Sequence, residues 1–174
     1  LSQSEALSLY GIFTGMALPC ILFPATITNS ASVMLTPSVA EMQALGYRSR
    51  IRYVTRHTFS ACILLGTLCT AFFYFFGSLA GTLLFHSEGA GLYIRTLSFI
   101  CPFLYTNIAL TSILNGLGKT GTTLIHSVIG VLLRISFVVF VIPAIGIRGY
   151  LYGLLLSEIV LSLLHIYALY HMES

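Results

Sequence analysis

The chain has 174 residues, of which 57% are hydrophobic and only 7% are charged. Soluble domains carry about 25% charged residues, so this composition excludes an ordinary soluble enzyme. A mean hydropathy of +0.95 predicts a polytopic integral membrane protein instead.

Five apolar runs are long enough to cross the ~30 Å of bilayer hydrocarbon as helices. Strands of a membrane barrel would alternate apolar and polar side chains, and runs such as AFFYFFG and FVVFVIP do not. We therefore predict an all-α, polytopic transmembrane bundle that forms a single membrane domain. Its spans lie at about residues 11–36, 59–85, 92–114, 122–143 and 150–171.

Basic residues indicate how these spans face the membrane, because cytoplasmic connections are enriched in Lys and Arg. Placing the first and third connections inside gives five bases on the cytoplasmic side and two outside. The inside set is Arg48, Arg50, Arg52, Arg56 and Lys119, and the outside set is Arg95 and Arg148. This placement predicts an external N-terminus and an internal C-terminus.

The beginning of the chain predicts a fragment of a longer, transporter-like protein. The first residue is Leu1 rather than Met, and the first ten residues contain Glu5 but no base, unlike a secretory signal peptide. An odd number of spans that begins outside is also unusual for a complete protein.

Motifs for metal, cofactor or nucleotide chemistry are missing from the sequence. The cysteines lie inside predicted spans without a C-x-x-C pair, which indicates buried thiols rather than metal ligands. The segment NGLGKT contains G-K-T, but a phosphate loop needs a glycine where Ile113 stands and a preceding strand. We expect no catalytic residue, metal, cofactor or nucleic-acid partner, and therefore no enzyme activity.

Polar residues gather inside two spans and leave two interpretations open. In the first span a polar cluster follows Pro24, and prolines bend membrane helices. In the third span polar residues recur at spacing four, on one helix face. These side chains either form hydrogen bonds between helices or line a hydrated cavity for a polar substrate. The predicted cavity set is Thr26, Asn29, Ser30, Asn107, Thr111 and Asn115.

Two charged residues lie deep within predicted spans, where an unpaired charge costs several kcal/mol. Arg134 and Glu158 lie at matching depths on adjacent antiparallel spans, so we predict a buried ion pair between them. His126 and His165 also lie at matching depths, near the cytoplasmic end. Packing and a proton relay are both open interpretations for this histidine pair.

Four segments resemble the C-terminal half of the stage V sporulation protein B group. They are LYGIFTGMALPCILFPATITNSASVMLTPSVAE, LLF near HSEGAGLYIR, CPFLYTNIALTSILNGLGKT and IPAIGIRGYLYG. That group belongs to the polysaccharide flippase branch of the multidrug/oligosaccharidyl-lipid/polysaccharide exporter superfamily. The resemblance covers nearly the whole chain.

This resemblance implies a fold of twelve to fourteen helices in two lobes around a central cavity that opens alternately to either side. The chain would form helices eight to twelve, without the N-terminal lobe and helix seven. It implies a bacterial cytoplasmic-membrane flippase for a lipid-linked saccharide or peptidoglycan precursor, with roles in cell-wall synthesis and sporulation. The partners would be the lipid bilayer, this substrate and the missing lobe.

Two alternatives remain open. The first is a cation-coupled multidrug exporter of the same superfamily, which would use a buried carboxylate, and Glu158 is the candidate. The second is a membrane remnant that does not transport.

Overall fold

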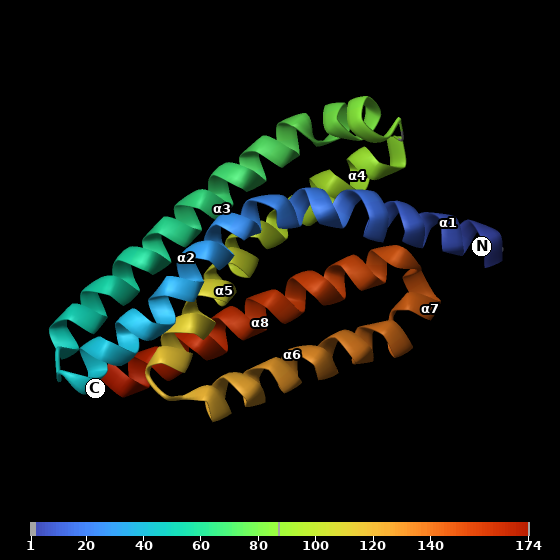
Figure 1. The fold of residues 1–174 in the computed structure, drawn as a ribbon. Helices are drawn as coiled ribbons and strands as arrows, with labels where there is room; N and C mark the ends of the chain where they lie inside the picture. The colour runs from blue at the N-terminus through green and yellow to red at the C-terminus, as the bar shows by residue number, and fades with distance from the viewer. Residues whose placement is uncertain (1–2, 87, 174) are drawn as a thin grey trace.

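The computed structural model of the protein describes residues 3–86 and 88–173 (Figure 1). Within these residues every regular element is helical. Five helices are long and apolar enough to cross a membrane. The predicted all-α fold with five spans is therefore confirmed, while several span boundaries differ from those predicted.

The first span is built from three consecutive helical segments, α1 (Gln3–Ile12), η1 (Phe13–Ala17) and α2 (Leu18–Ala44). The η1 segment is a π-helix, in which the Leu18 N–H bonds to the Phe13 carbonyl. Pro19 follows directly at the start of α2, and Pro24 and Pro37 lie inside it. Wide π turns and prolines both redirect helices, and the blue helix in Figure 1 changes direction along its length.

The second span, α3 (Arg48–Phe85), is much longer than predicted. Its 38 residues extend over about 57 Å at 1.5 Å per residue, nearly twice the hydrocarbon thickness. The predicted first connection was therefore wrong in extent, because only residues 45–47 separate α2 from α3. The four arginines of the predicted connection lie on the first turns of α3.

The third span is the central helix of the molecule. It consists of α4 (Glu88–Leu97), a 3-10 turn η2 (Ser98–Ile100) and α5 (Cys101–Gly116), with Pro102 in the first turn of α5. In the most apolar 18-residue segment of this span 61% is buried, compared with 17% in the corresponding segment of the second span. The α5 helix packs against α2, α3 and α8, so it connects the parts of the bundle.

The last two spans, α6 (Thr120–Phe140) and α8 (Ile147–Glu173), form an antiparallel hairpin. The short helix α7 (Ile142–Ile145) turns the chain between them. Figure 1 shows α6 on the outer side of α8, away from α2 and α3. The hairpin is attached to the rest of the bundle mainly through contacts between α8 and α5.

Close backbone approach fixes the packing of α3 on α5. A Cβ added at Gly66 would lie 2.3 Å from the Pro102 Cα, so only glycine permits this contact. The buried Tyr105 hydroxyl of α5 donates to the Ile21 carbonyl of α2 at 3.0 Å. Large apolar side chains of the outer faces of α3 and α6 remain exposed, as expected for surfaces that face lipid.

The connections predicted to be cytoplasmic lie at one end of the bundle. The α2–α3 turn, the α5–α6 turn and the end of α8 gather there, and α7 and the beginning of α1 lie at the opposite end (Figure 1). Five bases are therefore concentrated at the first end. This arrangement is the one that the predicted orientation requires.

Candidate functional site

A groove with polar side chains on its walls and a largely apolar surface, called the polar groove below, runs along α2 and α5 and reaches α8. Its volume is about 520 Å³. Three of the predicted cavity residues, Asn29, Asn107 and Thr111, line it together with the predicted ion-pair residue Glu158. The other residues that line it are Ser32, Val33, Thr36, Leu104, Ile108 and Ser112.

The remaining predicted cavity residues lie outside the set that lines this groove. Thr26 and Ser30 are exposed on α2, and their hydroxyls donate to carbonyls of their own helix, those of Phe23 and Thr26. Asn115 lies near the end of α5, where its Oδ1 accepts a hydrogen bond from Thr123 Oγ1 at 2.8 Å. Asn115 thus connects α5 to α6 rather than lining the groove.

Behind the groove, Arg134 of α6 and Glu158 of α8 are in direct contact through Nη2 and Oε1. Arg134 also donates from Nε to Ser157 Oγ at 2.8 Å. The Arg134 side chain is 37% exposed, whereas that of Glu158 is 7% exposed. The guanidinium therefore neutralises a buried carboxylate and uses two of its donors within the α6–α8 hairpin.

Asn107 joins this ion pair to the central helix. Its Nδ2 donates to Glu158 Oε2 at 2.7 Å and to the Glu158 carbonyl at 3.0 Å. Its Oδ1 accepts from Ser162 Oγ at 2.9 Å. Both ends of the amide therefore have partners, and these partners fix its orientation.

The two predicted histidine positions meet at the end of this network. The His126 and His165 rings are 5.0 Å apart between centroids and are inclined at 63°. His165 Nδ1 lies 3.4 Å from Asn107 Oδ1. Because an amide oxygen only accepts, this contact requires a proton on His165 Nδ1. The network thus continues from Arg134 through Glu158 and Asn107 to the histidine pair.

Sequence reasoning missed Ser157 and Ser162, which complete this network. A signal was present, because Glu158, Ser162 and His165 follow one another at spacings of four and three and so share one face of α8. Such a polar stripe on an otherwise apolar span indicates contact with another helix. The partner, Asn107, could not be identified from spacing within a single helix.

The site combines hydrogen-bonding side chains with apolar surface. Within residues 3–86 and 88–173 no group of three His, Cys, Asp or Glu residues is placed to hold a metal ion. The groove offers amides, hydroxyls and one neutralised carboxylate, next to the apolar side chains of Val33, Leu104 and Ile108. These groups can bind the polar part of an amphipathic molecule.

The part of the chain that the structure describes contains five helices long and apolar enough to cross a membrane, with an ion pair between two of them, and this defines a multi-pass helical membrane protein. The chain is homologous to stage V sporulation protein B of Bacillus subtilis (strain 168), with 25% identity over 158 residues. The alignment covers 90% of this chain and 30% of that protein.

A second relative is an uncharacterized membrane protein of Methanocaldococcus jannaschii. It is 25% identical over 139 residues, which cover 79% of this chain and 27% of that protein. The chain thus spans less than a third of the length of either relative. No family model and no solved structure matches the chain.

Proposed function

We propose that the chain is the C-terminal part of a flippase that moves a lipid-linked saccharide or peptidoglycan precursor across the bacterial cytoplasmic membrane. The observation that carries this proposal is the polar groove between α2 and α5, in which Asn29, Asn107 and Thr111 come together. A bilayer-spanning protein places polar side chains at membrane depth only where they meet protein, water or a polar ligand. An N-terminal lobe would complete the cavity around the substrate headgroup.

The surface beside the groove suits the lipid part of such a substrate. An apolar depression between α2 and α3 is lined by residues that include Pro19, Phe23 and Phe72. Helix α2 thus carries a polar stretch at the groove and an apolar stretch nearer the opposite end of the bundle. Headgroup binding in the groove and acyl chains in lipid would match this division.

Alternating access would follow from movement of this lobe against the N-terminal lobe. The hydrogen-bond network joins α5, α6 and α8 through side chains whose partners are inside the lobe. Such internal bonds favour movement of these helices as one rigid unit. We propose that α5, α6 and α8 move together and that no covalent chemistry takes place. The name of the Bacillus relative supports a precursor made for sporulation.

The test is headgroup translocation by the full-length protein in vesicles that contain a fluorescent lipid-linked precursor. The variant Asn29→Leu with Thr111→Val removes two polar groups from the groove and leaves the buried network intact. We expect the initial rate to fall about thirty-fold, since two hydrogen bonds to substrate are lost and each is worth about 1 kcal/mol. The matched control, Thr26→Val with Ser30→Ala, changes α2 outside the groove and should retain the rate.

An unchanged rate in the groove variant, or an equal loss in the control at equal protein amount, contradicts the assignment.

One observation favours a second candidate, a cation-coupled exporter, because the Glu158 carboxylate lines the groove. That function predicts drug efflux driven by an imposed ion gradient and abolished by Glu158→Gln. The contact with Arg134 favours the flippase, because it neutralises the carboxylate that a coupling cation would need.

A further inference from the structure

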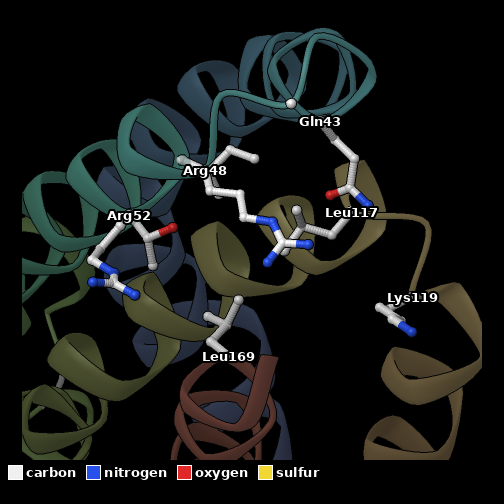
Figure 2. Close-up of a pocket in the computed structure, with 9 residues that line it drawn as sticks. Gln43, Arg48, Arg52, Leu117, Lys119 and Leu169 are labelled. Atoms are coloured by element: carbon white, nitrogen blue, oxygen red, sulfur yellow. The ribbon is translucent and has the colours of Figure 1, made fainter. Parts of the chain in front are cut away.

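A second cavity lies at the end of the bundle where the bases gather, away from the polar groove. Its volume is about 440 Å³. It is formed by the end of α2, the beginning of α3, the α5–α6 turn and the last turns of α8 (Figure 2). The nine residues that line it are Gln43, Gly46, Arg48, Ile51, Arg52, Thr55, Leu117, Lys119 and Leu169.

Two matching turns place bases at this cavity. Helices α2 and α5 are each followed, two residues after their last residue, by a glycine with positive φ, Gly46 at 73° and Gly118 at 72°. In both turns the residue after the glycine bonds back five residues, Tyr47 to Met42 and Lys119 to Leu114, each at 2.9 Å. This is the Schellman arrangement, which reverses the chain sharply at a helix end. It brings the start of α3 beside the α5–α6 turn.

The cavity has the charge and the donors of an anion site. Its nine residues include three bases and no acid. Figure 2 shows the Arg48 guanidinium and the Gln43 amide extending over the cavity, with Lys119 at its side. Thr55 lies on its wall with only 9% exposure, and its buried Oγ1 has no hydrogen-bond partner.

We propose that this cavity binds a phosphoryl group. A guanidinium presents two parallel N–H donors that match two phosphate oxygens, and an ammonium adds a compact positive charge. Arg48 supplies the guanidinium from the beginning of α3 and Lys119 supplies the ammonium from the α5–α6 turn, while the Gln43 amide supplies a neutral donor. Binding of one anion would hold the α2–α3 and α5–α6 turns together.

The position of the cavity fits a phosphate at the membrane surface. Because α3 is about 57 Å long, its first turns extend beyond the ~30 Å hydrocarbon layer. Leu117, Leu169 and Ile51 give the cavity apolar walls beside its bases. The phosphoryl group can belong to an anionic lipid headgroup or to a soluble phosphate compound, and the two sources are distinguished by experiment.

The experiment uses the purified full-length protein. Phosphatidic acid and phosphatidylglycerol are titrated against it, with phosphatidylcholine as the neutral reference, and bound lipid is counted by native mass spectrometry. Inorganic pyrophosphate is the soluble probe, added in competition with phosphatidic acid. The variants are Arg48→Gln and Lys119→Gln. Arg56→Gln, which removes the same charge from an exposed position of α3 outside the cavity, is the matched control.

We expect Arg48→Gln and Lys119→Gln each to weaken binding of phosphatidic acid about ten-fold, the effect of losing one charged hydrogen bond. Arg48→Lys keeps the charge without the two parallel donors and should restore part of the affinity, which separates a site defect from misfolding. If pyrophosphate displaces phosphatidic acid, the site is open to soluble phosphates. If pyrophosphate does not displace it, the site is specific for a lipid headgroup. Either result supports the proposal. Binding that is unchanged in both Gln variants, or equally reduced in Arg56→Gln, overturns it.

Discussion

One amide of the central helix holds both the side chain and the backbone of a buried acid. Asn107 Nδ2 lies 2.7 Å from Glu158 Oε2 and 3.0 Å from the Glu158 carbonyl oxygen. Glu158 in turn contacts Arg134. Because Asn107 belongs to α5 and its partners to the α6–α8 hairpin, this side chain connects the hairpin to the rest of the bundle.

Replacement of Asn107 by Leu should therefore destabilise the protein. The substitution leaves a buried carboxylate oxygen without its Asn107 donor, at a cost of about 1–3 kcal/mol, while the Glu158 carbonyl keeps its helical N–H partner. The measurement is unfolding of the purified protein in detergent by increasing amounts of dodecyl sulfate. The control is the neighbouring Thr106→Val, because Thr106 is 1% exposed and its Oγ1 has no partner. Thr106→Val should be neutral or stabilising, and a loss equal to that of Asn107→Leu would contradict the interpretation.

The two members of the ion pair should respond unequally to neutralisation. Arg134→Gln leaves the 7% exposed Glu158 side chain charged and without its counter-ion, so we expect a loss of about 2–3 kcal/mol. Glu158→Gln should cost less, because the new amide oxygen still accepts from Asn107 and the long Arg134 side chain is already 37% exposed.

The double variant tests whether these costs share one origin. Removing both charges should cost less than the sum of the two single changes, by about 1 kcal/mol, which is the size expected for a coupled pair in a membrane protein. Unfolding of the four proteins in one detergent provides the comparison. Additive costs, or a larger loss for Glu158→Gln than for Arg134→Gln, would show that the contact does not contribute as inferred.

Much of this architecture could be predicted because it depends on local composition. Apolar length identified the five spans, and matching depth identified the partners Arg134 and Glu158. The extent of α3 could not be predicted, because its first turns are basic and their helical structure depends on neighbours beyond the apolar window. The residues of the groove could be predicted only in part, because their contacts depend on where the helices cross. Spacing placed Asn107 and Asn115 on one face, but the crossing helices decide that the first meets α8 and the second meets α6.

The spacing of small residues also did not suffice to predict which helices pack closely. Sequence pairs such as Gly11 and Gly15 satisfy the spacing for close helix contact, yet an added Cβ would meet nothing within 4 Å at either position. At Gly66, by contrast, an added Cβ would lie 2.3 Å from the Pro102 Cα, a backbone atom. Close approach depends on where two helices cross, and the spacing of glycines along a sequence does not give the crossing point.

Gly66→Ala should therefore be among the most damaging single-methyl additions in the chain. The new methyl group would meet backbone atoms that cannot rotate away, so α3 and α5 must separate, at a cost of about 1–3 kcal/mol. Gly130→Ala should cost less, because its nearest contact is the flexible end of the Leu161 side chain, 2.2 Å away. Gly121→Ala meets nothing within 4 Å and should be neutral or slightly stabilising. Detergent unfolding ranks the three variants, and equal losses would contradict the packing of α3 on α5.

The orientation of the bundle gives a prediction that needs no purified protein. Lys119 lies at the end of the bundle that holds five bases, and Ile145 lies in α7 at the opposite end. The positive-inside rule places the first end in the cytoplasm. In whole cells a membrane-impermeant maleimide should therefore label Ile145→Cys but not Lys119→Cys, and permeabilised cells should show labelling of both. The native cysteines lie within the spans and are buried or partly buried, so a protein without added cysteine gives the background. Labelling of Lys119→Cys in intact cells with protection of Ile145→Cys would reverse the orientation and would place the proposed phosphoryl site on the outer surface of the membrane.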